Sequence, residues 1–303
     1  MKFLMIVRRN LALFLKNKMN ILLSFASIGV VLCLYVFFLR DFMIAQVKAS
    51  GMDGAYVKQF TDRLMFSGLL PVVSTTTCFG IIQICVNDNA SGVRRDYLAA
   101  PVRPFSLTLG YWAAGGVVSC FFTCLTMLLG EFYFQFEFEC PLGSAVFLKT
   151  CALLVLSAFV NAAIVLLFAK GLKNTATFST FANLYGTLIG FLAGSYLPAS
   201  FYPDWLRPVL FFYPPAQLTS LCRQYALQAM KPKLFPAAPG ACDKAFENFG
   251  VVLKRAGEIA GQKEQLLIVA AAMAVLLLVL CAGKLHRPDR FAVRKLGAYG
   301  KKK

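Results

Sequence analysis

The fold is decided by the stretch FSLTLGYWAAGGVVSCFFTCLTMLLG, residues 105–130, in which no side chain carries a formal charge. Roughly 20 apolar residues of helix cross a bilayer core about 30 Å thick, so this stretch can span it with some tilt. Similar uncharged runs predict five further spans, at residues 21–39, 64–86, 150–169, 175–196 and 266–283. We therefore expect an all-α integral membrane protein with six transmembrane helices.

The composition agrees with a membrane protein and leaves two explanations for the strong positive charge. Of the 303 residues, 58% are hydrophobic and 15% are charged, whereas soluble domains carry about 25% charged residues. The net charge of +17 is typical either of nucleic-acid binding or of the basic cytoplasmic loops of membrane proteins. The positions of the basic residues decide between the two.

Basic residues gather on the side of the membrane that six spans assign to both termini. They are Lys2, Arg8, Arg9, Lys16, Lys18, Arg94, Arg95, Arg103, Lys170, Lys173, Lys284, Arg287, Arg290, Arg294, Lys295 and Lys301–Lys303. The long segment on the other side balances its basic residues with acids such as Asp204, Asp243 and Glu247. This bias predicts a multi-pass protein of the plasma membrane with both termini in the cytoplasm, and no nucleic-acid partner.

Residues 1–19 have a different pattern from the span that follows them. Apolar side chains form one stripe at helical spacing: Phe3, Leu4, Val7, Leu11, Phe14 and Leu15. Lys2, Arg9 and Lys16 lie on the other side of the same helix. A basic amphipathic helix of this kind lies flat in the headgroup region, so we expect an interfacial helix. The alternative is an extension of the first span into the cytoplasm.

The five spans that occupy residues 20–196 are followed by the longest non-spanning segment, residues 197–264. It begins LPASFYPDWLRPVLFFYPPAQLTSL, whose five prolines exclude one continuous helix. Its apolar and aromatic side chains predict short re-entrant helices in the outer leaflet, with Pro203, Trp205 and Pro214 as markers. Residues 241–265 read as a charged surface helix leading into the sixth span at 265–284, and residues 285–303 form a basic tail.

Several kinds of chemistry lack their motifs in this chain. It has no GxxxxGK[ST] phosphate loop and no HExxH, and its one histidine is His286 in the basic tail. The spans hold almost no ionisable side chains, which disfavours a proton-driven carrier. We therefore expect no metal site and no cofactor on this chain, so its energy would come from a partner. Three of the ten cysteines, Cys140, Cys222 and Cys242, lie near outer loops, and the sequence does not decide whether two of them form a disulfide.

The loop at residues 87–104 is the candidate docking element for that partner. The sequence reads VNDNASGVRRDYLAAPVRPFSL over residues 86–107, and Pro101 ends a short helix predicted over residues 93–100. Its candidate coupling residues carry charge, turn chemistry or an apolar ridge: Asp88, Ser91, Gly92, Arg94, Arg95, Asp96, Tyr97, Leu98 and Pro101. The alternative is a basic loop that only sets topology.

This loop resembles the segment between the second and third helices of ABC-2-type transporter permeases, whose pattern is roughly E-x-E-x-G-T-x-x-x-L-x-x-T-P. Gly92 and Pro101 match it, and Asp88 keeps an acid at the first position. The departures are Ala90, Val93, Tyr97 (with Leu98 beside it) and Ala100. A second similarity links residues 202–214 to the family's re-entrant "LPxWLxxI…NPLTY" region.

The resemblance implies a permease subunit of an ATP-binding cassette exporter. In this family two permeases pair, as a homodimer or heterodimer, above two ATPase subunits that hold ATP and Mg²⁺. The path between the permeases would be lined here by Ser74, Thr75, Thr76, Thr77, Asn183, Tyr185 and Thr187. For each of these, a hydrogen bond between helices is the alternative. A lining rich in aromatic residues and poor in charge favours an amphiphilic cargo, such as a drug, a peptide or a lipid-like molecule. The cargo itself and the direction of transport stay open.

Two other classes of function compete with the permease. A membrane-embedded lipid-modifying enzyme would need clustered acids, and Glu131, Glu137 and Glu139 are the clearest group. Because they alternate with phenylalanines, we interpret them as the edge of an interfacial hairpin or as a loop. A sensor or accessory subunit that transports nothing is the third class.

Overall fold

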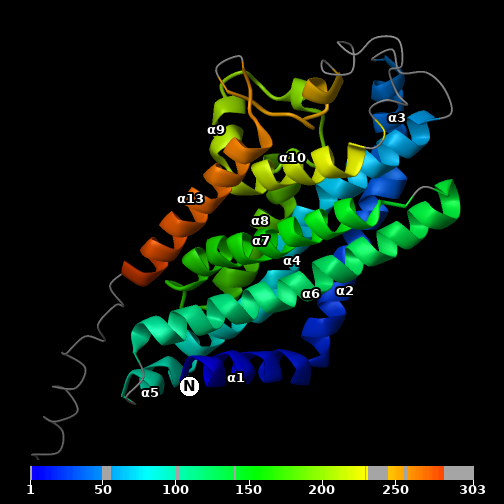
Figure 1. Ribbon diagram of the computed structural model, residues 1–303. Helices are drawn as coiled ribbons and strands as arrows, with labels where there is room; N and C mark the ends of the chain where they lie inside the picture. The colour runs from blue at the N-terminus through cyan, green and yellow to red at the C-terminus, as the bar shows by residue number, and fades with distance from the viewer. Residues whose placement is uncertain are drawn as a thin grey trace, which may run out of the picture.

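The computed structural model describes residues 2–49, 56–99, 103–139, 141–228, 230, 245–255 and 258–282. Its long helices form a bundle (Figure 1) and are α2 (Lys18–Leu34), α4 (Tyr56–Ala90), α6 (Pro104–Phe138), α7 (Ser144–Ala169), α8 (Thr175–Leu192) and α13 (Gln262–Ala282). The shorter elements are α1 (Lys2–Lys16), η1 (Tyr35–Leu39), α3 (Arg40–Ala49), α5 (Val93–Ala99), η2 (Ala199–Phe201), α9 (Arg207–Phe212), α10 (Pro214–Leu227), β1 (Lys254–Arg255) and β2 (Glu258–Ile259).

Helix α4 is the centre of the bundle. Within its most apolar window 78% of the residues are buried, compared with 22% for the first span and 17% for α13. It contacts α2, α6, α7, α8 and α10. Figure 1 shows α1 and α5 at one end of the bundle, here the α5 end, and α3 and α9 at the opposite end, the α9 end. Helix α4 therefore connects the two ends through the core.

Five helical stretches in the described residues are long and apolar enough to cross a membrane. The first is longer than predicted, because α2, η1 and α3 run on without a break over residues 18–49. The other four are α4, α6, α7 and α13. Helix α8, the predicted fifth span, has 18 residues and includes Asn183 and several threonines, and it is not among the five.

The N-terminal helix is separate from the first span, as its pattern predicted. Asn17 ends α1 and caps α2, because its side chain accepts hydrogen bonds from the amides of Met19 and Asn20. Ile6, Val7 and Phe14 are buried, on a helix that packs against α6 and α4. A second apolar side of α1, with Leu4 69% exposed and Leu15 64% exposed, faces away from the protein.

Two predictions about surface segments were wrong. Residues 131–138 continue α6 as a helix and are neither a hairpin edge nor a loop, because helical spacing lets Phe134 and Phe138 stack on one side. The supposed surface helix at 241–265 is, in its described part, one helical turn at 245–248, the antiparallel pair β1–β2 and the start of α13. There Gly250 has φ +66°, which ends the turn.

Candidate functional site

The α5 end is organised around the carboxylate of Asp88, which is 5% exposed near the end of α4. Arg9 of α1 binds it with both terminal guanidinium nitrogens, Nη1 and Nη2, and Nη2 lies 2.8 Å from Oδ1. The Tyr111 hydroxyl of α6 donates to Oδ2 at 2.5 Å. The guanidinium also lies over the Tyr97 ring of α5, 5.6 Å from its centroid. One carboxylate thus connects α1, α4 and α6, and Arg9 extends the group to α5. We name Arg9, Asp88, Tyr97 and Tyr111 the Asp88 joint.

A second set of contacts fixes the start of α5 against the loop between α7 and α8. Arg94 donates to the Asn89 side chain at 2.8 Å and to the carbonyl of Lys170 at 3.3 Å. Asn89 donates in turn to the carbonyl of Leu172 at 3.0 Å. The Lys170 ammonium reaches the carbonyl of Leu280 in α13 at 2.5 Å. Side-chain hydrogen bonds at the α5 end therefore connect α1, α4, α5, α6, α13 and the loop between α7 and α8.

Burial and charge shift two pKa values at this end. The hydrogen bond and the charge of Asp88 raise the pKa of Arg9 above its ordinary value, so its cation is secured. Burial, with a smaller contribution from the nearby Arg94 charge, lowers the pKa of Lys170. The α5 end therefore combines a firmly held ion pair in the Asp88 joint with a separate ammonium group, that of Lys170, whose charged form is disfavoured.

The predicted coupling residues divide into an inward set and an outward set. Asp88 and Tyr97 belong to the joint, and Arg94 binds the α7–α8 loop. Arg95 and Asp96 are exposed on α5. Gly92 starts the helix with φ +83°, and Ser91, also exposed, bonds the carbonyl of Asn87 at 2.8 Å. Leu98 lies within α5, and Pro101 lies outside the described residues.

The predicted path-lining residues of α4 mostly point into the bundle. Ser74 contacts the Ser119 hydroxyl at 3.1 Å and accepts from Asn161 at 3.2 Å. Thr75 and Thr77 are buried and donate to carbonyls of their own helix. Ser74 therefore fits the alternative of a hydrogen bond between helices, whereas Thr75 and Thr77 bond within their own helix. Thr76 is half-buried and lies 3.5 Å from the Ser27 hydroxyl of α2.

The candidates on α8 are more accessible. Asn183 and Thr187 are exposed on one side of α8. The Tyr185 hydroxyl lies 2.6 Å from that of Tyr213, just before α10. At the α9 end Trp205 is 72% exposed, Pro203 is exposed, and Pro214 is half-buried at the start of α10. Of the predicted cysteines only Cys222 is described, as a buried free thiol, while Cys140 and Cys242 lie outside the described residues.

Two of the three glutamates that were considered for an enzyme, Glu131 and Glu137, form ion pairs. Arg63 of α4 bonds Glu131 at 3.2 Å, and the same carboxylate accepts from the amide of Leu142 at 2.9 Å. Lys58 bonds Glu137 at 2.7 Å. These acids join α6 to α4 and do not converge on a common point, so this arrangement favours a structural role.

A comparison with protein families agrees with this geometry. The sequence model of a family described as "ABC-2 family transporter protein" matches residues 44–282, which is well over half of the chain. The chain belongs to the ABC-2 transporter family. As a member of that family it is a multi-pass membrane protein and a transport component, and such proteins generally work with an ATPase subunit. No curated protein matches the chain.

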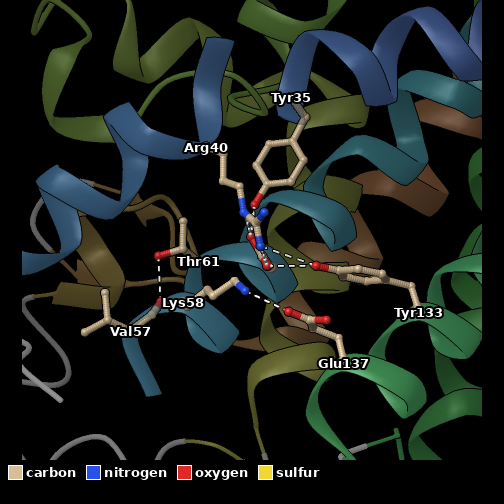
Figure 2. A network of polar contacts seen from close by, with 8 residues as sticks. Tyr35, Arg40, Val57, Lys58, Thr61, Tyr133 and Glu137 are labelled. Atoms are coloured by element: carbon tan, nitrogen blue, oxygen red, sulfur yellow. Dashed lines mark hydrogen bonds and ion pairs between the residues drawn. The ribbon is translucent and has the colours of Figure 1, made fainter. Parts of the chain in front are cut away.

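Sequence reasoning missed the residues that hold this ABC-2 protein together at its two ends. Arg9 was only one of the basic residues of an amphipathic helix, and its partner lies 79 positions away. At the α9 end, Figure 2 shows a second polar network in which Tyr35, Arg40 and Tyr133 converge, with Lys58 and Glu137 beside them. Their common acceptor, Asp62, lies just before the run of residues 64–86 that predicted the second span. Its position beside Arg63 was the available signal.

Proposed function

We propose that the chain is the permease subunit of an ATP-binding cassette exporter, driven by a separate ATPase subunit that docks on α5. The supporting observation is the arrangement of α5. Its inward residues contact α1 and the α7–α8 loop, while Arg95 and Asp96 are exposed at the end of the bundle. A helix that is bonded to the bundle on its inward side and exposes charged side chains on its outward side is suited to bind a moving partner. It would transmit the partner's displacement to α4.

The remaining features of the proposal follow from the family and from the surface of the bundle. Six spans, with α8 as the fifth, would place both termini in the cytoplasm at a plasma membrane, and the short helices at residues 199–227 would be re-entrant. A second permease, identical or related, would complete the path beside α2 and α8. The side chains available there are aromatic, aliphatic, hydroxyl and amide groups, such as Phe25, Leu184, Thr76 and Asn183. They suit an amphiphilic cargo.

Co-purification with an ABC-type ATPase subunit tests the proposal. The informative variant is the double reversal Arg95→Glu/Asp96→Arg, and the matched control is Asp41→Arg, an exposed acid on α3 at the opposite end. We expect the wild type and the control to retain the ATPase subunit and the reversal to lose it. Failure of the wild type to bind any such subunit would overturn the proposal. Binding without transport would favour the sensor class.

A further inference from the structure

The first span contains a π turn, η1, between α2 and α3. The buried residues of α2 and η1 are Ser24, Ile28, Val31 and Tyr35, at steps of four, three and four. In α3 the inward positions resume at Arg40, Met43 and Val47. The step from Tyr35 to Arg40 is five, which in a regular α-helix would turn the second stripe by about 140° from the first. The π turn absorbs the extra residue and keeps both stripes facing α4.

One carboxylate binds the residues on both sides of this turn. Asp62 of α4 is 1% exposed and accepts a hydrogen bond from the Tyr35 hydroxyl. The Arg40 guanidinium reaches its two oxygens at 2.9 Å and 2.5 Å. The Tyr133 hydroxyl of α6 lies 3.3 Å from Oδ2. Figure 2 shows the side chains of Tyr35, Arg40 and Tyr133 converging. We name Tyr35, Arg40, Asp62 and Tyr133 the Asp62 clamp.

The clamp stabilises a backbone form that is rare without such support. π turns are rare, appear mostly as single turns inside α-helices and are frequently found at functional sites. Here the backbone N–H of Arg40 bonds the carbonyl of Tyr35, and the same two residues bind Asp62 through their side chains. On the outward side of the turn, Phe37 and Phe38 are each 77% exposed. Within the described residues, the turn is therefore bonded on its inner side, and its outer side packs against no other helix of the chain.

We propose that Asp62 is a positioning residue that holds the first span in this register. We further propose that the π turn is the hinge at which α3 moves against α2 during transport. Release of Tyr35 and Arg40 frees the turn, and displacement of α3 opens the α9 end of the path. This inference rests on the proposed function. It assigns different roles to the two ends of α4. The Asp88 joint transmits the displacement of α5 to α4, and the Asp62 clamp opens in response.

A reversible cross-link separates a movable clamp from a merely structural one. The experiment uses the double variant Arg40→Cys/Asp62→Cys in a Cys33→Ser background, because Cys33 is exposed. A bifunctional methanethiosulfonate links the two introduced cysteines within the complex with the ATPase subunit. We expect the cross-linked complex to have about tenfold lower ATPase activity, because the link blocks a motion that turnover requires. Reductant should restore the activity. The two single-cysteine variants, treated alike, are the controls. A linked complex with undiminished activity would overturn the inference, while intact co-purification would leave the proposed function standing.

A second measurement uses the unmodified complex. Amide hydrogen exchange over residues 35–40 is compared between the nucleotide-free state and a state trapped with a non-hydrolysable ATP analogue, with residues 64–78 of α4 as the internal reference. We expect exchange over residues 35–40 to differ between the states by about tenfold or more, because a freed turn loses its hydrogen bonds. Equal exchange in both states contradicts the inference whatever the variants do.

Discussion

Arg9 of α1 and Asp88 of α4 stand 79 positions apart in the sequence and form a two-point ion pair at the α5 end. With Tyr111 donating to the same carboxylate, both oxygens of Asp88 are occupied within the chain. The acid at the first position of the loop motif thus holds the amphipathic helix in place. In the proposed function, contacts with the ATPase subunit therefore fall to the exposed residues Arg95 and Asp96 on α5.

Arg9→Ala should destabilise the protein by about 3 kcal/mol, because it leaves a buried carboxylate without its cation. Arg8→Ala is the matched control, since Arg8 is the exposed neighbour on the same helix and should change stability by less than about 0.5 kcal/mol. The melting temperature in detergent measures both. Equal melting temperatures for the two variants would show that the Asp88 joint does not support the fold.

Gly92→Ala should weaken the start of α5 by about 1 kcal/mol, because a Cβ is strained at its positive φ although no atom of the described residues lies within 4 Å of that Cβ. Gly171→Ala, in the α7–α8 loop, also meets nothing within 4 Å, and no positive φ marks it. The comparison therefore isolates backbone strain from crowding. Retention of the ATPase subunit during purification is the readout, and we expect it to fall only for Gly92→Ala.

Ser74→Ala and Asn183→Ala should have separate effects, although both residues were predicted to line the path. Ser74 bonds Ser119 and Asn161 inside the bundle, so its loss should cost about 0.6 to 1.7 kcal/mol of stability. Asn183 is exposed on α8, so its loss should leave the melting temperature unchanged and alter the cargo dependence of ATPase activity. The opposite result, in which Ser74→Ala alters the cargo dependence and Asn183→Ala lowers the melting temperature, would contradict these assignments.

Arg223→Lys should be as damaging as Arg223→Met, despite the retained charge. The Arg223 guanidinium is buried and donates to the carbonyls of Leu64 at 3.3 Å, Ser195 at 3.1 Å and Phe249 at 3.1 Å. A lysine ammonium cannot reach three separate segments from one point, and each unpaired carbonyl costs about 1 to 3 kcal/mol. Arg207→Lys, at a half-exposed site on α9, should be tolerated. Thermal unfolding distinguishes the two positions.

The sequence predicted most helices but few of the contacts between them. Uncharged runs located the five apolar spans because the bilayer requires length and apolarity. The bend at Asn17 and the turn at Gly92 were predictable because capping and positive φ are local properties. The Asp62 clamp was not predictable, since it joins Tyr35 to Tyr133 through an acid between them. A π turn also leaves no local composition signal.

The wrong prediction for residues 131–138 has a physical cause. Residues 131–138 carry charges that suggested a surface, but the charges of Glu131 and Glu137 are neutralised by Arg63 and Lys58 on the neighbouring helix. The path lining by the threonines of α4 stays a prediction. In this structure Thr75 and Thr77 donate their hydroxyls to the carbonyl four residues earlier.

The uneven burial of the spans also bears on biogenesis. The first span and α13 are strongly apolar and only 22% and 17% buried in their apolar windows, so we expect that each can leave the translocon and reside in lipid alone. Helix α4 cannot, because it carries Asp62, Arg63 and Asp88 and relies on partners in other helices to neutralise them. Its stable insertion therefore waits for α6, which supplies Tyr111, Glu131 and Tyr133. We expect the ribosome to have synthesised more than a third of the chain before its central helix settles in the membrane.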